Sequence, residues 1–149
     1  MNVFTLAALA AALAWTGSAR AETPAPLAIP FDDPAIEWGP CPEFIPAGCR
    51  IAVLQGNPAE HNADIFFKLP PGTRVPHHWH TSAERMVLVS GELHVTYDGH
   101  ETTVLRTGMY AYGPAKLPHK AYCAEGAPCV LFIAFEGPLD AVPVEGSAE

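Results

Sequence analysis

Positive charge is scarce in this chain. Of its 149 residues, 8 are lysine or arginine and 16 are aspartate or glutamate, so the formal net charge is −8. The few basic residues do not form a run. Nucleic acids and anionic membrane surfaces attract proteins through clustered basic residues, so the composition argues against both as partners.

Long apolar stretches are missing after the first 17 residues, which argues against a transmembrane helix in the rest of the chain. The first stretch is itself too short to span a bilayer comfortably, and Ala19-Arg20-Ala21 follows it as an A-x-A cleavage site. Residues 1–21 are therefore predicted to be a secretory signal peptide, cleaved after Ala21. The mature protein would be periplasmic or secreted, with a formal charge of −9 because Arg20 leaves with the peptide.

Cysteine is sparse but even in number. Cys41 and Cys49 bracket one short loop, and Cys123 and Cys129 bracket another. In an exported protein this pattern suggests disulfides, with three possible connectivities, of which the two local pairs are favoured. Zinc thiolates are a weaker alternative, because neither pair has the two-residue spacing of a zinc knuckle. Free buried thiols remain a third possibility.

Helical signals are also lacking. Apolar runs of five to seven residues, interrupted by 16 prolines and 12 glycines, favour short strands and many turns. Strands are predicted at 50–55, 63–69, 74–80, 84–90, 92–97, 100–105, 109–112, 119–123 and 129–135. Their regular spacing indicates one all-β sandwich or barrel over residues 50–136. Residues 22–49 are predicted to be an extended, proline-rich arm, and residues 137–149 a loose, acidic tail.

Histidines and one glutamate form the clearest chemical pattern. His78 and His80 are two residues apart, which places both imidazoles on one face of an extended strand. Glu84 follows a turn of small residues and can meet them across a hairpin, and His119 could close the set from a neighbouring strand. A lone histidine on a strand is more often structural, but four positions agree here. Three imidazoles and a carboxylate suit one divalent transition metal ion: Fe, Mn, Ni, Co, Cu or Zn.

The spacing of these residues resembles the first motif of the cupin family. That motif reads G, five residues, H-x-H, three or four residues, E, six residues, G. Every position is matched, by Gly72, His78, His80, Glu84 and Gly91.

The second cupin motif reads G, five residues, P-x-G, two residues, H, three residues, N. It aligns with Gly108, Pro114 and His119, but Lys116 stands in place of a glycine and Cys123 in place of the asparagine. The resemblance covers roughly residues 50 to 135.

What the resemblance implies is a double-stranded β-helix, or jelly-roll barrel, that holds a metal ion and acts on a small molecule. The family includes dioxygenases, isomerases, decarboxylases and lyases, and a homodimer is typical. A dioxygenase-type enzyme is the first expectation, because an open metal site is combined with an apolar cavity. Glu84 could double as a base, and Tyr110 or Tyr112 could orient the substrate if the face they share points inward.

Two other functions remain open from the sequence. The protein could be a non-catalytic periplasmic cupin that binds a metal or small ligand for sensing, scavenging or storage. Its small size, the lack of an evident lid and the absence of an obvious partner for a charged substrate fit that reading. Arg85 and Lys116 could attract an anionic substrate, but solvated surface positions are expected for both. A weaker option is a barrel that uses the metal for stability alone.

Overall fold

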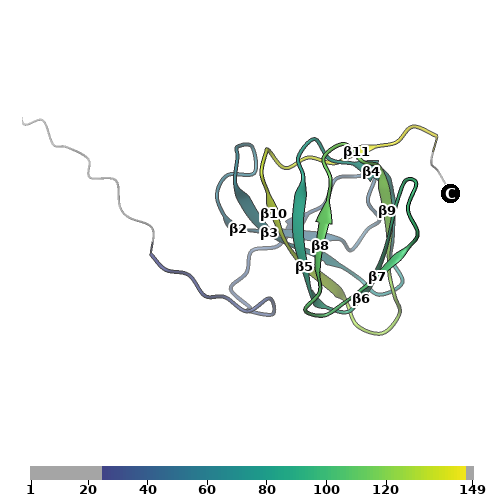
Figure 1. Ribbon diagram of the computed structural model, residues 1–149. Coiled ribbons are helices and arrows are strands. Elements are labelled where there is room, and N and C mark those ends of the chain that lie inside the picture. The colour runs from purple at the N-terminus through teal and green to yellow at the C-terminus, as the bar shows by residue number, and fades with distance from the viewer. Residues whose placement is uncertain (1–24, 147–149) are drawn as a thin grey trace, which may run out of the picture.

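The computed structural model describes residues 25–146, so the predicted signal peptide lies outside the described residues. This part of the chain is all-β and forms two facing antiparallel sheets (Figure 1). The six-stranded sheet contains, in spatial order, β1 (Gly39–Pro40), β2 (Arg50–Gln55), β3 (Ala63–Leu69), β10 (Cys129–Phe135), β5 (Glu84–Ser90) and β8 (Tyr110–Gly113). The five-stranded sheet contains β11 (Val142–Pro143), β4 (Arg74–Trp79), β9 (His119–Cys123), β6 (Glu92–Tyr97) and β7 (Thr103–Arg106).

The expected jelly-roll barrel is confirmed. All nine predicted strands are present with small shifts at their ends, and the two-residue strands β1 and β11 are additional. Between residues 25 and 146, no helix is long and apolar enough to cross a membrane.

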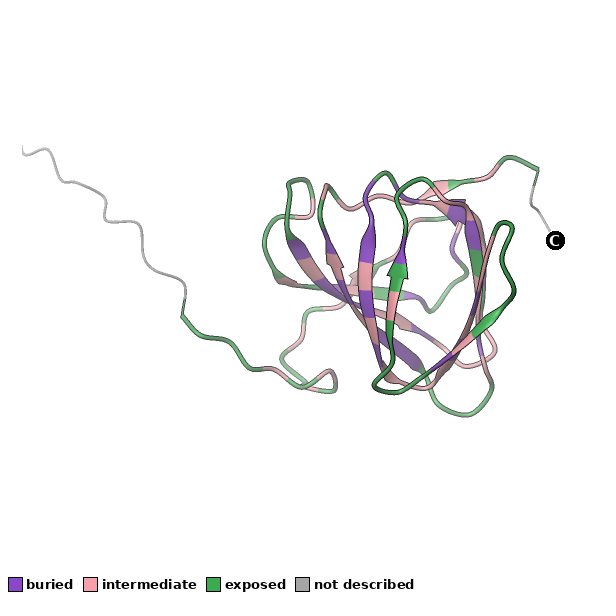
Figure 2. Ribbon diagram, viewed as in Figure 1, coloured by how far each residue is buried: buried purple, intermediate pink, exposed green. Residues whose placement is uncertain are grey.

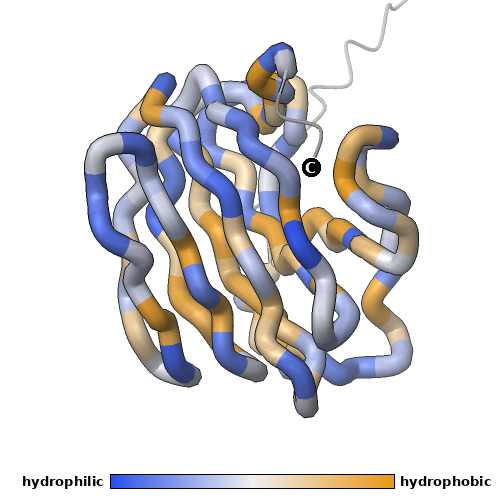
Figure 3. Tube along the Cα trace, turned by 90° about the vertical axis from the view of Figure 1, so that its right-hand side faces the viewer, coloured by the Kyte–Doolittle hydropathy of each residue, from blue (hydrophilic) through white to orange (hydrophobic). Residues whose placement is uncertain are grey.

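The core lies between the two sheets, because alternate side chains of each strand point there. Along β5, buried residues alternate with more exposed ones (Figure 2). Hydrophobic positions gather in the middle of the strands and hydrophilic ones at the turns (Figure 3). The most completely buried large side chains include Ile65, Leu69, Leu88 and Leu131. These four come from β3, β5 and β10, the neighbouring inner strands of the six-stranded sheet.

A second apolar cluster covers the outer face of the six-stranded sheet. Phe66 lies there because it alternates with the inward-facing neighbours of β3, and its ring stacks on Trp38 with 6.5 Å between centroids. Phe31 and Ile36 of the arm pack against the same cluster. The arm is therefore attached to the barrel by its aromatic and aliphatic residues.

Two disulfides join the favoured local pairs. Cys41 and Cys49 have Cα atoms 5.6 Å apart, and the Cα atoms of Cys123 and Cys129 are 5.8 Å apart. The second bridge links β9 of one sheet to β10 of the other. No cysteine is left free. Disulfides of this kind are typical of oxidising compartments.

The C-terminal segment differs from the expectation of a loose tail. Within it, β11 pairs with β4, so that Val142 lies opposite Trp79 and Pro143 opposite His78. The backbone N–H of Leu139 also donates to the carbonyl of Pro58 at 2.8 Å. Figure 1 shows this yellow segment crossing one end of the barrel beside β4. The sequence gives no alternation here, because the segment is held by backbone groups of β4 rather than by its own apolar residues.

Candidate metal centre

A β-bulge in β4 sets the direction of the first two histidines. Val75 pairs with Ala121 and His78 with His119, so three residue steps on β4 match two on β9. Pro76 lies inside this bulge, where its missing N–H costs no regular ladder bond. The extra residue lets Val75 and His78 both face the interior, although residues three apart normally face opposite sides of a strand.

His78 and His80 share one face of the strand, as predicted. His78 and His80 are buried, with 5% and 9% of their surface exposed. His77, which precedes them, points outward, and its Nε2 lies 2.9 Å from Asp98 Oδ1. His80 itself follows the last residue of β4, and His119 is the first residue of β9.

Backbone carbonyls fix the orientation of all three imidazoles. In each ring Nδ1 faces a carbonyl oxygen, which can only accept, so Nδ1 must carry the proton. The acceptors are Pro76 for His78 at 2.7 Å, Leu117 for His119 at 3.3 Å, and Asp140 for His80. Each Nε2 is therefore left with a free lone pair. Metal-bound histidines are typically held in this way, by a backbone group on the nitrogen that does not bind the ion.

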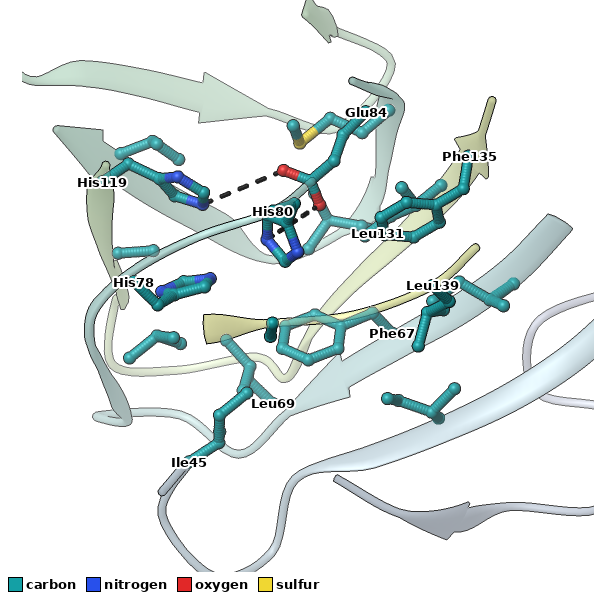
Figure 4. A pocket seen from close by; sticks show the side chains of 18 of the residues that line it. Ile45, Phe67, Leu69, His78, His80, Glu84, His119, Leu131, Phe135 and Leu139 are labelled. Atoms are coloured by element: carbon teal, nitrogen blue, oxygen red, sulfur yellow. Dashed lines mark ion pairs between the residues drawn. The ribbon is translucent and has the colours of Figure 1, made fainter. Parts of the chain in front are cut away.

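The carboxylate of Glu84 lies between two of these rings (Figure 4). Its Oε1 is 3.4 Å from His80 Nε2, and its Oε2 is 3.8 Å from His119 Nε2. One ligand atom from each of the three imidazoles lies within 4.8 Å of the others. The three imidazoles predicted as ligands thus converge, and the carboxylate of Glu84, from β5 of the opposite sheet, contacts two of them.

Burial keeps two of the histidine rings in the neutral state that binds a metal ion. Burial, followed by the charge of nearby histidines, lowers the pKa of His78 to about 4 and that of His119 to about 3. Both rings are therefore neutral near pH 7 and able to coordinate. Burial also raises the pKa of the Glu84 carboxyl. A divalent cation would supply the positive charge that this buried carboxylate lacks, so the donor set fits a metal ion.

A small cavity of about 70 Å³ adjoins the four side chains. Its walls are mainly aliphatic and aromatic, and include Ile45, Phe67, Leu69, Leu131, Phe135 and Leu139. Met86 is part of the wall. Leu88, two residues further along β5, is fully buried in the core. Among the described residues, no lysine or arginine lines this cavity.

The structure does not bring Tyr110 or Tyr112 to this site. Both are exposed, by 60% and 53%, on the outer side of β8. Ala111, between them, takes the inward position and packs against the core. The face shared by the two tyrosines therefore points to solvent, which removes them from the candidate catalytic residues.

Tyr97 is the tyrosine that lines the cavity, and sequence reasoning missed it. It lies directly opposite His119 in the β6–β9 pairing, with 4.7 Å between ring centroids. Leu93 and Val95 alternate as inward-facing apolar residues along β6. Tyr97 is two residues further on, so this alternation predicts that it faces inward as well. Burial, and then the charge of Glu84, raises the pKa of its hydroxyl.

The C-terminal segment supplies a further contact that the sequence did not reveal. Besides the bond from His80 to the Asp140 carbonyl, the Asp140 carboxylate accepts two hydrogen bonds from Thr81. These come from the backbone N–H at 2.9 Å and from Oγ1 at 2.7 Å. Ser82 Oγ accepts two more bonds, from the backbone N–H groups of Glu136 and Gly137 at 3.0 and 2.8 Å. The chain around His80 is thus tied to the segment that crosses the cavity.

The departures from the second motif also have structural explanations. Lys116, in place of glycine, has φ of +61°, so it adopts the left-handed conformation that the motif's glycine would take without strain. Cys123, in place of asparagine, forms the disulfide to Cys129. Both positions keep the local geometry that precedes and follows His119.

Comparison with solved structures shows the same fold in proteins of several activities. The DMSP lyase DddQ from Ruegeria pomeroyi DSS-3 is 20% identical with a TM-score of 0.65, over 76% of this chain and 64% of that one. An RmlC-like cupin from Shewanella frigidimarina NCIMB 400 is 25% identical with a TM-score of 0.57, over 70% and 86%. Oxalate decarboxylase from Bacillus subtilis is 21% identical with a TM-score of 0.58, over 66% and 29%.

These likenesses show a fold found in metal-dependent enzymes and do not transfer an activity. The chain spans just under two thirds of the length of the two DMSP lyases. Among curated proteins, none matches the sequence. The family model described as "Cupin domain" matches residues 65–135, a range that contains all four converging side chains. On this match, the barrel topology and the solved structures of the same fold, residues 65–135 of this chain are a cupin domain.

Proposed function

We propose that this protein is an exported, metal-dependent cupin enzyme that acts on a small molecule, with dioxygenase-type chemistry. His78, His80, His119 and Glu84 hold one divalent transition metal ion. The observation that carries the proposal is the convergence of three oriented imidazoles and a buried carboxylate on the wall of an apolar cavity. A closed structural metal site would have no cavity beside its ligands.

Each of these residues has a separate role in the proposed function. The three imidazoles bind and are kept from rotating by their carbonyl partners. Glu84 binds the ion and is also the carboxylate placed to accept a proton from a molecule in the cavity. A bound divalent ion supplies Lewis acidity toward an oxygen atom of that molecule. The aliphatic walls exclude water and admit apolar molecules, dioxygen among them.

The reaction type follows from what the cavity offers. Among the described residues that line it there is no serine, cysteine or lysine to act as a nucleophile. Chemistry here would therefore depend on the metal ion and on proton transfer. The Bacillus subtilis oxalate decarboxylase is a protein of this fold with Mn(II) centres, so manganese is a candidate together with Fe, Ni, Co, Cu and Zn.

Oxygen uptake tests the proposal. The protein is stripped, loaded separately with each metal, incubated without air with candidate enols and catechols, and then exposed to air. We expect oxygen consumption and a matching product with one metal, and loss of both in the His78→Ala/His119→Ala double variant. Product formation without oxygen consumption would replace the dioxygenase by a lyase, isomerase or decarboxylase.

A non-catalytic metal- or ligand-binding cupin is the second candidate. The small cavity, about 70 Å³, favours it because little room is left beside an ion. Tight metal binding without conversion of any candidate molecule, with any metal, would support this function. Elemental analysis of the protein purified from its native compartment would identify the ion in either case.

Export and self-association belong to the same proposal. The two disulfides support an oxidising destination, and a mature chain that begins at Glu22 would confirm cleavage after Ala21. We also propose a homodimer, because Phe132 and Val89 on the outer face of the six-stranded sheet remain only partly buried under the arm. Light scattering coupled to size-exclusion chromatography tests the dimer.

A further inference from the structure

The hydroxyl of Tyr97 is buried and has no hydrogen-bond partner. It is the one buried side-chain polar atom left unpaired between residues 25 and 146. Buried polar groups are almost always paired, and leaving one unpaired is costly. The Tyr97 hydroxyl is therefore free to bond a molecule that enters the cavity.

The hydroxyl lies beside the proposed ligands. Gly113 of β8 does not have a positive φ, so its backbone conformation does not require glycine. A Cβ at this position would, however, lie 2.6 Å from the Tyr97 hydroxyl and 3.1 Å from Glu84 Oε2. The absence of a side chain at Gly113 therefore leaves room for both the Tyr97 hydroxyl and Glu84 Oε2.

The rest of the cavity wall has no free polar side chain that could bind a ligand. Apart from the four proposed ligands and Tyr97, its only charged or polar lining residue in the described chain is Asp140. The Asp140 carboxylate is already occupied by Thr81. Polar recognition is thus confined to one end of the cavity, where Tyr97 and the Nε2 atoms lie, and all other contacts are with hydrocarbon.

We propose that the Tyr97 hydroxyl donates a hydrogen bond to an oxygen atom of the bound molecule. That molecule is small, with a single polar end at the metal ligands and an apolar remainder. A second charged group at the far end would be buried among aliphatic side chains without a partner, at a large free-energy cost. The inference rests on the proposed function, since the bound molecule is the substrate, but it concerns binding and can be tested without turnover.

Isothermal titration of the zinc-loaded protein with butanoate and butanedioate tests the class of molecule. The two probes share one carboxylate and a similar length, and they differ in whether the far end is a methyl or a second carboxylate. We expect butanoate to bind at least about tenfold more tightly, because only butanedioate must bury an unpaired charge. Equal or tighter binding of butanedioate, or no binding of butanoate, would overturn the inference.

The variant Tyr97→Phe tests the hydrogen bond. We expect butanoate affinity to fall about fivefold, the size of one hydrogen bond, while zinc affinity is unchanged. The melting temperature should stay the same or rise, because an unpaired buried hydroxyl is removed. The matched control is Tyr122→Phe. The Tyr122 ring lies under the guanidinium of Arg74 on the outer side of β9, so removal of its hydroxyl should leave butanoate binding unchanged.

The outcomes separate this inference from the proposed function. Tyr97→Phe with a lowered melting temperature and unchanged butanoate affinity would give the hydroxyl a purely structural role and refute the inference. Failure of the wild-type protein to hold zinc or any other metal would instead refute the proposed function.

Discussion

The backbone N–H of Lys116 donates a hydrogen bond of 2.8 Å to the carbonyl oxygen of His80. Lys116 adopts a left-handed conformation, with φ of +61°, and in this position it bonds the segment that carries a proposed metal ligand. The strain at one residue is thus balanced by a backbone contact beside the metal centre.

Replacement of Lys116 by glycine should stabilise the protein. Glycine takes a positive φ without steric cost, so we expect the free energy of unfolding to rise by about 0.5–1 kcal/mol, with unchanged metal affinity. Urea denaturation measures the change. The control is Lys120→Gly in β9, where φ is not positive and the same substitution should destabilise. A loss of stability in Lys116→Gly would show that the side chain, rather than the backbone, matters there.

Glu84→Gln should have opposite effects with and without metal. In the metal-free protein it removes a carboxyl whose pKa is raised by burial, so the melting temperature at pH 8 should rise. The loss of charge should weaken metal binding at least about tenfold. Thermal shift assays with and without added metal measure both effects. Unchanged metal affinity would remove Glu84 from the ligand set.

Acid should destabilise the metal-free protein below about pH 6.5. The pKa values of His78 and His119 are about 4 and 3 in the folded state, against 6.5 for an unperturbed histidine. The unfolded chain therefore binds more protons in this range, and stability falls as pH falls, by ~1.4 kcal/mol per pH unit for each imidazole. Chemical denaturation at several pH values measures the slope. The double variant His78→Gln/His119→Gln should lose it, and a flat wild-type profile from pH 6.5 to 4 would contradict the prediction.

Asp140→Ala tests the tie between the C-terminal segment and His80. Removal of the two hydrogen bonds from Thr81 should let the Asp140 carbonyl move and release the His80 ring. Loss of such an orienting partner typically lowers metal affinity about 10- to 100-fold. Competition with a chelator measures that affinity. Glu145→Ala, an exposed carboxylate in the same segment, is the control and should leave it unchanged.

The four proposed ligands could be found from the sequence because strand periodicity and motif spacing are local properties. His78 and His80 need only an extended backbone to share a face. The inward or outward direction of Tyr110 and Tyr112 was not available in that way, since it depends on how β8 pairs with β5. Tyr97 could have been identified from the alternation along β6.

The contact from His80 to Asp140 had no sequence signal at all. It uses a main-chain carbonyl, which every residue has, so neither composition nor periodicity marks it. The bulge before His78 was equally invisible, because it is defined by the register against β9. Contacts that depend on backbone pairing between distant segments could therefore not be predicted from the sequence. The ligands could be predicted, because their spacing along the chain is visible in the sequence.

The position of residues 137–146 has a practical consequence for anyone who engineers this protein. A version trimmed to the family match, residues 65–135, would retain all four proposed ligands and lose the carbonyl that aims one of them. It would also expose the hydrocarbon that Leu139 and Ala141 now shield. A deletion or fusion at this end of the chain is thus an alteration of the metal centre itself, however remote it looks in the sequence.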